Sequence, residues 1–459
     1  MKFAISRCGW SSQTRRKTVS SMKLDPIGDW RRTHYSVDVK PEMDGEEVTL
    51  FGWVQEVRDL GGIRFIILQD REGTIQVTVL RKKAGSELVS KSDVLQKRYA
   101  IGVKGTIKKT QMTPRGVEVL PKEIRIFNTA EPLPIDITEK TPANLEVCLD
   151  ARALDLCRGG NIAIFKIQHT AEEAIRSFLF DRGFLEVRTP RIIGSATEGG
   201  AALFSLDYFG RKAFLAQSPQ LYKEELVMSL EKVFEIGPFF RAEMSHTRHH
   251  LSEFVSIDIE EAFATAEDVI RVLEQLMQHT CRTVAEKCKK ELATLKYKLE
   301  VPEVPFKRLT YSEVLEGLKR EGIEIPWGED IPTPAFRRVG KLHPYFYFIV
   351  DWPTKAKAFY IKPRDDNPEI SEGFDLMWRW LELVSGGTRI ASKELLVKRL
   401  RENGLNPESF KHHLQAFDYG MPPHAGWAIG LGRLTMMLTG KKNIREVTLY
   451  PRDKFRLAP

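Results

Sequence analysis

Between Glu46 and Phe127 the apolar residues come in five short runs. The runs read VTLFGWVQEV, RFIILQD, GTIQVTVL, YAIGVKGTIKK and GVEVLPKEIRIF, with turns at Gly61-Gly62, Glu72-Gly73 and Pro114-Arg115-Gly116. Apolar residues that alternate with polar ones predict strands with one buried face. Five such strands in succession predict a small Greek-key barrel of the OB type.

Barrels of this type often bind single-stranded nucleic acid on one face, where aromatic side chains stack against bases. Phe65 in the second run and Gln76 in the third are the candidates to face a base. A position in the barrel core explains Phe65 equally simply, so the pattern alone leaves both interpretations open.

After the barrel, the apolar spacing changes to that of helices. An amphipathic helix is predicted over Asn161–Arg182, which ends at Gly183, and a second begins near Thr265, where Asp268 can cap the first turn. Between them, VFEIGPFFRAE and LSEFVSIDIEEAF flank a polar loop and predict a hairpin. Long strands that alternate with helices in this way predict an α+β domain with a mostly antiparallel sheet flanked by helices.

These patterns predict the domain organisation. Residues 1–28 are rich in Ser, Arg and Lys, lack acids before Asp25, and predict a disordered basic tail; a mitochondrial presequence or a true start at Met22 are the alternatives. The barrel domain is placed at 29–128 and a proline-marked connector at 129–160. The larger domain follows at 161–459, with a small insertion near 300–345.

Composition narrows the class of protein. The chain has 459 residues, 42% of them hydrophobic, without an apolar run of the roughly 20 residues that span a membrane. Its five cysteines are scattered without a CxxC pair, which argues against a zinc site or disulfides and favours a cytoplasmic location. The net charge of +8 fits a nucleic-acid partner, although a merely basic surface explains it as well.

Arg241 and Glu243 follow an apolar strand at a spacing that places both on one face. An arginine fork can hold a phosphate through two hydrogen bonds, and Glu243 could accept from an adenine amino group. A surface ion pair is the simpler explanation of this pair alone. In the following loop His250 is better suited to a phosphate than to a metal, because no third ligand is spaced to join His249 and His250.

Arg433 follows a glycine-rich turn formed by Gly426, Gly430 and Gly432. These glycines allow close backbone approach before a helix, but their spacing is not that of the dinucleotide fingerprint. A purely structural turn explains them if they are taken in isolation.

Two further segments carry candidate ligands. Glu382 and Ser385, with Asp375 upstream, offer oxygen atoms to Mg²⁺, although a helix-end cap is the alternative. In QSPQLYKEE, Lys223 can read a carboxylate as a point charge, and Arg389 can add a bidentate contact. Together they would select a small anionic side chain, whereas Lys223 alone would be an ordinary solvated lysine.

Taken together, GFLEVRTP, FRAE with its loop, GLGRL and QSPQLYK closely resemble the ordered motifs of class II aminoacyl-tRNA synthetases. The best match is the aspartyl-tRNA synthetases of the archaeal and eukaryotic type, over about residues 29–459. The resemblance implies a homodimer with Pro190 at its interface. It also implies that L-aspartate reacts with ATP, in the presence of Mg²⁺, to form aspartyl-adenylate. The aspartyl group would then be transferred to the 3′ end of tRNA-Asp.

The resemblance further implies a role for each matching residue. Arg241 would hold the α-phosphate, Glu243 adenine, and His250 and Arg433 the γ-phosphate. Mg²⁺ would bind at Glu382 and Ser385, near Asp375. The amino acid and the anticodon would be bound as follows: the α-amino group by Glu198, Gln220, Asp258 and, as a weaker candidate, Ser218; the β-carboxylate by Lys223 and Arg389; the anticodon by Arg58, Phe65, Gln76 and Glu118.

Lys223 favours aspartate over asparagine, because an amide would leave the two cations without an anion. The resemblance implies that family members which charge only tRNA-Asp carry Trp and Lys at the positions of Gln55 and Pro114. We therefore expect this chain to charge tRNA-Asn as well. The chain departs from the family at His249 and at Ile390-Ala391-Ser392. The rival hypotheses are an asparagine-forming or asparaginyl-type paralogue, the former typically lacking the barrel, and an inactive tRNA-binding relative.

Overall fold

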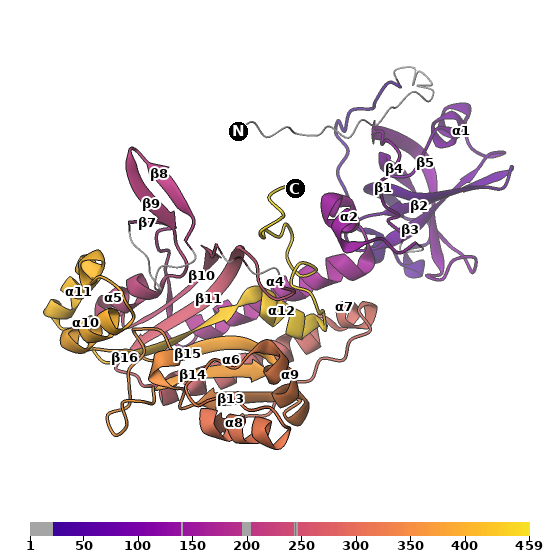
Figure 1. Cartoon of the computed structure of the whole chain (residues 1–459). Coiled ribbons are helices and arrows are strands. Elements are labelled where there is room, and N and C mark those ends of the chain that lie inside the picture. The colour runs from indigo at the N-terminus through magenta and orange to yellow at the C-terminus, as the bar shows by residue number, and fades with distance from the viewer. Residues whose placement is uncertain (1–21, 139–140, 195–202, 243, 245–246) are drawn as a thin grey trace, which may run out of the picture. The chain divides into compact units, whose positions relative to one another are not determined.

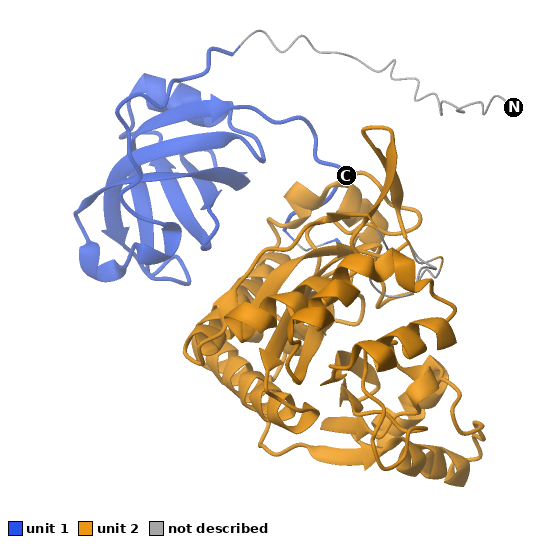
Figure 2. Ribbon diagram, turned by 90° about the vertical axis from the view of Figure 1, so that its left-hand side faces the viewer, with its two compact units in different colours: residues 1–142 blue, residues 143–459 orange. Residues whose placement is uncertain are grey.

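The computed structural model describes residues 22–138, 141–194, 203–242, 244 and 247–459. The chain divides into two compact units, residues 1–142 and 143–459, which are coloured separately in Figure 2. Within the part described, no helix is long and apolar enough to cross a membrane. The four described cysteines, Cys148, Cys157, Cys281 and Cys288, form no disulfide with one another.

The first unit is a closed barrel of five strands in the order β1-β2-β3-β5-β4, as predicted (Figure 1). Its strands are β1 (Glu47–Asp59), β2 (Ile63–Gln69), β3 (Thr74–Leu80), β4 (Ala100–Lys109) and β5 (Val117–Asn128), and the helix α1 (Ser86–Asp93) joins β3 to β4. Alternate residues such as Ile66 and Leu68 are buried inside the barrel, whereas Phe65 is half-buried and lies outside this core. The core interpretation of Phe65 is therefore wrong.

The barrel unit begins before residue 29. The backbone N–H of Asp25 donates to the carbonyl oxygen of Ile126 at 2.8 Å, and its carboxylate pairs with Lys91. Met22 packs against the barrel core. The end of the predicted tail is thus part of the folded unit, and the rest of that tail lies outside the described residues.

The second unit is built on a sheet of eight strands in the order β12-β13-β14-β15-β16-β11-β10-β6. Only the outermost pair on each side of this sheet is parallel, so the predicted antiparallel character is confirmed. The strands are β12 (Lys307–Thr310), β13 (Phe346–Val350), β14 (Gly373–Trp378), β15 (Leu381–Thr388), β16 (His424–Gly430), β11 (Glu253–Ala262), β10 (Lys232–Phe240) and β6 (Leu185–Glu186).

Two long helices pack against this sheet and against each other, α4 (Gly159–Phe180) and α6 (Ala266–Lys287). Both were predicted from their apolar stripes, which enter the main core. At the start of α6 the backbone N–H of Thr265 donates to the Asp268 carboxylate at 2.9 Å, which confirms the predicted cap. A third helix, α12 (Leu431–Thr439), follows β16 directly and packs beside α4.

The structure places two segments, the connector and the insertion, differently from the sequence-based prediction. Part of the predicted connector forms α2 (Leu145–Asp150) and α3 (Arg152–Asp155), and belongs to the second unit. The predicted insertion supplies the edge strand β12 together with α8 (Tyr311–Arg320) and α9 (Thr333–Leu342), which pack around their own apolar cluster. It therefore extends the main sheet rather than forming a separate lobe.

The remaining elements surround the sheet. A small sheet is formed by β7 (Ile192–Ile193), β9 (Arg211–Leu215) and β8 (Ser205–Tyr208). The other helices are α5 (Gln220–Leu230), α7 (Lys289–Thr294), α10 (Lys393–Glu402) and α11 (Lys411–Ala416). Of these, α5 contacts both β10 and β11, and α11 contacts α5.

Candidate active site

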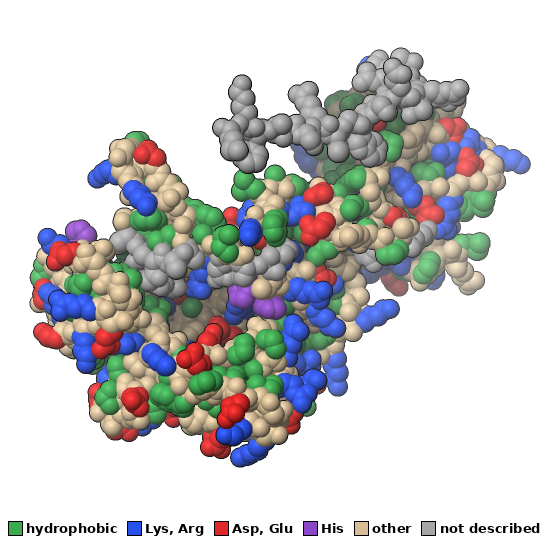
Figure 3. Space-filling model, viewed as in Figure 1, with side chains coloured by type: hydrophobic (Ala, Val, Ile, Leu, Met, Phe, Trp, Pro, Cys, Tyr) green, Lys and Arg blue, Asp and Glu red, His purple; other side chains and the backbone are tan. Residues whose placement is uncertain are grey.

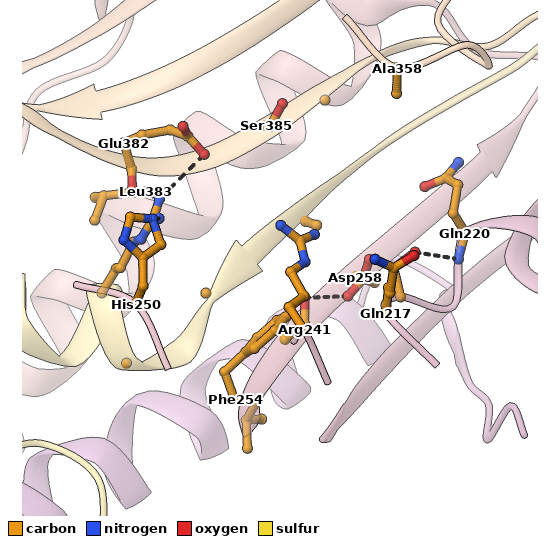
Figure 4. A pocket seen from close by; sticks show the side chains of 18 of the residues that line it. Gln217, Gln220, Arg241, His250, Phe254, Asp258, Ala358, Glu382, Leu383 and Ser385 are labelled. Atoms are coloured by element: carbon orange, nitrogen blue, oxygen red, sulfur yellow. Dashed lines mark hydrogen bonds and ion pairs between the residues drawn. The ribbon is translucent and has the colours of Figure 1, made fainter. Parts of the chain in front are cut away.

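A cavity of about 330 Å³ opens on the antiparallel sheet of the second unit. Figure 3 shows a hollow on this face, bordered by acidic, basic and histidine side chains. Its walls come from segments far apart in the sequence, and Figure 4 shows their side chains pointing into one space. Nine of the predicted site residues line it: Ser218, Gln220, Arg241, His250, Asp258, Glu382, Ser385, Arg389 and Arg433.

Arg241 lies at one side of the cavity, immediately after β10. Its backbone N–H donates to the carbonyl oxygen of Ser252 at 2.9 Å, and its guanidinium carbon lies 5.4 Å from the centre of the Phe254 ring. The hairpin β10–β11 thus holds the base of the side chain while the head reaches the cavity. Glu243 and Glu198 lie outside the described residues.

Arg433 enters the cavity from the first turn of α12. Its Nη1 donates to the carbonyl oxygen of Glu382 at 2.9 Å, and its Nη2 lies 3.2 Å from Nε2 of His250. The Nδ1 of His250 lies 2.6 Å from the Thr247 hydroxyl, which orients the ring. The two residues predicted for the γ-phosphate are therefore adjacent.

The glycines before Arg433 serve different purposes. A Cβ on Gly426 would meet the carbonyl oxygen of Ile259 at 2.2 Å, so a side chain there would separate β16 from β11. A Cβ on Gly432 would meet Ile444 at 2.8 Å, whereas on Gly430 it would find nothing closer than 3.9 Å. Gly430 alone leaves open space beside the cavity, and the other two allow close packing.

The oxygen ligands predicted for Mg²⁺ lie on the hairpin β14–β15. Asp375 is opposite Ser385 in this pair of strands, and Glu382 and Ser385 line the cavity, so the helix-cap interpretation is wrong. Both carboxylate oxygens of Asp375 accept from the ammonium of Lys357, at 2.6 and 2.7 Å. Burial raises the pKa of Asp375 despite this lysine. Among the described residues, no three His, Cys, Asp or Glu side chains form a metal cluster.

Lys223 is not solvated, because only 2% of its side chain is exposed. Its ammonium lies 3.1 Å from Asp258 and 3.3 Å from Glu260, under the floor of the cavity rather than in its lining. Arg389 does line the cavity, and its Nε donates to Glu260 at 2.8 Å. Two cations and two carboxylates thus form a buried, balanced cluster, of which Asp258 and Arg389 line the cavity while Lys223 and Glu260 lie behind them.

Glu260 was missed in the sequence, although a signal for it existed. Residues two apart on a strand share a face, so Glu260 had to lie beside Asp258 on β11. Lys357 carried no comparable signal, because its position beside Asp375 depends on a loop that packs against the sheet.

His249 lies between His250 and Trp380, with ring centres 5.5 and 5.0 Å away. Burial, and then the electrostatic influence of His250 and Arg433, lower the pKa of His249 to about 4. The ring is therefore neutral at pH 7, and this end of the cavity owes its positive charge to the arginines.

In the barrel unit, the predicted anticodon residues share one outer face. Arg58 lies opposite Phe65 in the pair β1–β2, and Phe65 lies opposite Thr78 in the pair β2–β3. The Gln76 amide donates to the Glu118 carboxylate at 2.9 Å. Gln55 is the extra residue of a bulge in β1, and Pro114 is exposed in the loop between β4 and β5.

Pro190 is exposed, and both of its neighbours are held by the buried carboxylate of Glu235. The backbone N–H of Thr189 donates to this carboxylate at 3.0 Å, and Arg191 does so at 2.6 Å. Pro190 is thus exposed between two residues that are both anchored to the same carboxylate.

Comparison with known proteins identifies the fold. Residues 144–454 match the class II tRNA synthetases (D, K and N), and residues 48–127 match an OB-fold nucleic acid binding domain. The chain belongs to the class II tRNA synthetases.

Among curated members of this family, the chain is 50% identical to the aspartate–tRNA(Asp/Asn) ligase of Archaeoglobus fulgidus over 427 residues, 93% of this chain and 99% of that protein. It is 51% identical to the Methanopyrus kandleri protein of the same name, with the same coverage.

Solved synthetases of two amino-acid types share this fold. The asparaginyl-tRNA synthetase of Pyrococcus horikoshii, solved with asparaginyl-adenylate, has a TM-score of 0.90, 32% identity, and coverage of 94% of this chain and 100% of that one. The aspartyl-tRNA synthetase of Entamoeba histolytica has a TM-score of 0.82, 33% identity, and coverage of 95% and 96%. The fold alone therefore does not distinguish aspartate from asparagine.

Proposed function

We propose that this chain is an aspartate–tRNA ligase, which activates L-aspartate with ATP and transfers it to the 3′ end of tRNA-Asp. One observation carries the proposal: a single cavity joins Arg241, His250 and Arg433 to Arg389, which is backed by a buried acidic residue and a buried lysine. The first group suits a triphosphate and the second an anionic side chain. The printed names of the curated relatives support the same activity.

In the first step, the α-carboxylate of aspartate attacks the α-phosphorus of ATP, and pyrophosphate leaves as aspartyl-adenylate forms. Arg241 is assigned to the α-phosphate and Arg433 with His250 to the γ-phosphate, so that charge is neutralised along a bent triphosphate. In the second step, the terminal ribose hydroxyl of the tRNA takes the aspartyl group. The residues mainly position the reactants and neutralise charge, and little acid–base chemistry is required of them.

Mg²⁺ fits this cavity because Glu382 and Ser385 offer hard oxygen ligands on its wall. A bound Mg²⁺ would supply positive charge to the phosphate oxygens. Asp375 is paired with Lys357, so we assign it as a neighbouring charge behind these two ligands.

Selection of aspartate is assigned to Arg389, with Lys223 acting from beneath through Glu260 and Asp258. Asparagine has nearly the same shape, so size cannot exclude it. Glu260 already accepts from one side of the Arg389 guanidinium, and an amide would leave the side that lines the cavity without a carboxylate. Sites built to pair a polar group reject such analogues by roughly 10⁴-fold. Glu198, Gln220 and Asp258 are assigned to the α-amino group, with Ser218 as a weaker candidate.

We further propose that the enzyme also aspartylates tRNA-Asn. The curated relatives are named for both tRNAs. The resemblance to the family also implies that members which charge only tRNA-Asp carry Trp and Lys where this chain has Gln55 and Pro114. The anticodon is assigned to the barrel face that carries Arg58, Phe65, Gln76 and Glu118. We also assign a homodimer with Pro190 at its interface. No disulfide joins the described cysteines, which fits a reducing compartment, and we place the enzyme in the cytoplasm.

The test is to charge purified tRNA-Asp and tRNA-Asn transcripts side by side with aspartate. Comparable rates are expected, and a rate for tRNA-Asn that is hundreds of times lower would reject the dual specificity alone. Pyrophosphate exchange with aspartate or asparagine tests the main proposal. Exchange with asparagine only would indicate an asparaginyl-type enzyme, and no exchange with either would indicate an inactive relative.

A further inference from the structure

Behind the end of the cavity that carries Gln220 and Arg389 lies a buried cluster that the proposed mechanism does not use. It consists of Glu224 on α5, His413 on α11 and His424 at the start of β16, with exposures of 0, 3 and 0%. Glu224 lies one helical turn after Gln220, so both side chains are on the same side of α5. The cluster thus adjoins a residue that lines the cavity, although its own members do not.

The contact between Gln220 and Glu224 determines how the Gln220 amide is oriented. Nε2 of Gln220 lies 2.5 Å from Oε1 of Glu224. An ionised carboxylate only accepts hydrogen bonds, so the amide nitrogen must be the atom that faces it. The amide oxygen is then left on the side of the cavity, where Figure 4 shows it, and can accept from an ammonium group.

This orientation depends on the charge of Glu224. A protonated Glu224 could donate its hydroxyl to the amide oxygen, and the amide could then turn its nitrogen towards the cavity. Burial opposes ionisation of Glu224, yet its pKa is lowered, because His413 and His424 outweigh the burial. A protonated histidine beside Glu224 therefore keeps its carboxylate in the form that only accepts hydrogen bonds.

His413 is the better placed of the two histidines. Its Nε2 lies 3.3 Å from Glu224, and its Nδ1 lies 3.2 Å from Glu225, so the ring bridges two carboxylates. His424 lies 3.7 Å from Glu224, and its Nδ1 is occupied by the carbonyl oxygen of Pro422 at 2.8 Å. Burial alone would lower the pKa of His413, but the two carboxylates raise it to about 9.

We propose that His413 is a positioning residue for the amino-acid substrate: it holds Glu224 as a carboxylate, which orients the Gln220 amide so that its oxygen accepts from the substrate's α-ammonium group. The inference rests on the proposed function, in which Gln220 binds that group. It makes α11, a short helix outside the cavity, part of the amino-acid specificity of the site.

The experiment measures aspartate-dependent pyrophosphate exchange for the full chain carrying His413→Phe. A lost hydrogen bond to a charged group predicts a rise of about tenfold or more in the KM for aspartate. The KM for ATP should stay within about twofold of the unaltered enzyme, since Arg241 and Arg433 are untouched. His413→Lys retains a cation beside both carboxylates and should recover part of the loss.

The neighbouring His412 is exposed and provides a matched control, because His412→Phe makes the same change outside the cluster. Succinate provides a second readout, since it has both carboxylates of aspartate and no amino group. Its inhibition constant should be unchanged in His413→Phe, whereas a general disturbance of the pocket would weaken aspartate and succinate alike. Glu224→Gln, which can no longer fix the amide orientation, should show the same selective loss.

A KM for aspartate within twofold of the unaltered enzyme in folded His413→Phe would overturn the inference, and so would equal losses for aspartate and succinate. If His413→Phe does not fold, as judged by circular dichroism, Glu224→Gln and His413→Lys decide by the same criteria. If the unaltered enzyme shows no aspartate-dependent exchange, the proposed function fails instead.

Discussion

Replacing Arg389 by methionine separates substrate binding from stability in the buried charge cluster. In the folded protein Arg389 and Lys223 neutralise Glu260, which is fully buried, and Lys223 also pairs with Asp258. The substitution keeps an unbranched apolar side chain but removes the only one of these cations that lines the cavity. It therefore leaves the acidic pair opposed by a single lysine.

The expected cost follows from this arrangement. Breaking a buried ion pair by removing one partner costs about 3–5 kcal/mol. Because Lys223 stays 3.3 Å from Glu260, we expect the lower end, about 3 kcal/mol. The double variant Arg389→Met/Glu260→Gln removes one charge of each sign and keeps the pair of Lys223 with Asp258 at 3.1 Å. It should recover about 2 kcal/mol of unfolding free energy.

Activity should not recover in the same way. Loss of a desolvated charge contact to the β-carboxylate is worth about 3–4 kcal/mol, which is a fall of about 10²- to 10³-fold in kcat/KM for aspartate. The double variant restores the charge balance without restoring a cation in the cavity. We therefore expect it to regain stability while its kcat/KM for aspartate stays low.

Urea unfolding gives the free energies, and pyrophosphate exchange with aspartate and with asparagine gives the activity. Arg399 is a matched control, because it is a buried arginine that donates to Glu402 at 2.9 Å outside the cavity. Arg399→Met should lower stability and leave the KM for aspartate unchanged. The reasoning is refuted if Arg389→Met keeps kcat/KM for aspartate within tenfold of the unaltered enzyme, or if the double variant recovers activity together with stability.

Three further predictions follow from the same site. Arg241→Ala should abolish aspartate-dependent pyrophosphate exchange with an unchanged circular dichroism spectrum, and near-normal exchange would contradict its assignment. The pKa of His413 is raised from its ordinary 6.5 to about 9, so its stabilisation, at most about 3 kcal/mol, is complete below pH 6.5 and lost as the pH rises through about 9. Urea unfolding across this range should show the loss, and an equally steep loss in His413→Phe would exclude this origin. Glu382→Gln should raise the Mg²⁺ concentration for half-maximal exchange about tenfold or more, and an unchanged Mg²⁺ dependence would remove Glu382 from the metal site.

Most of the fold could be predicted because its signals are local. The barrel strands follow from alternation along each run, and the cap of α6 follows from Thr265 and Asp268, three residues apart. The predictions that were wrong or incomplete concern segments without periodic patterns. The helices α2 and α3 are too short to leave a clear stripe, and the edge strand β12 owes its place to pairing with β13.

The site could be predicted in its parts but not in its connections. Arg241 and Arg433 stood out as phosphate ligands, and the strands β10, β11 and β16 bring them to one cavity. Lys223 was expected to face the substrate directly, and instead it lies below Asp258 and Glu260. Nothing in the spacing of residues indicated that this lysine would be enclosed by two acids.

The sequence by itself therefore determined most of the elements, the family and the types of ligand group, because apolar periodicity, caps and motif chemistry depend on residues close together in the chain. Only the tertiary structure decided which charges meet. Whether Arg389 pairs with Glu260, or His413 with Glu224, depends on distances of a few ångströms between distant segments. At such distances in a buried setting, the strength of a charge pair depends on its geometry and its desolvation, and sequence separation carries no information about either.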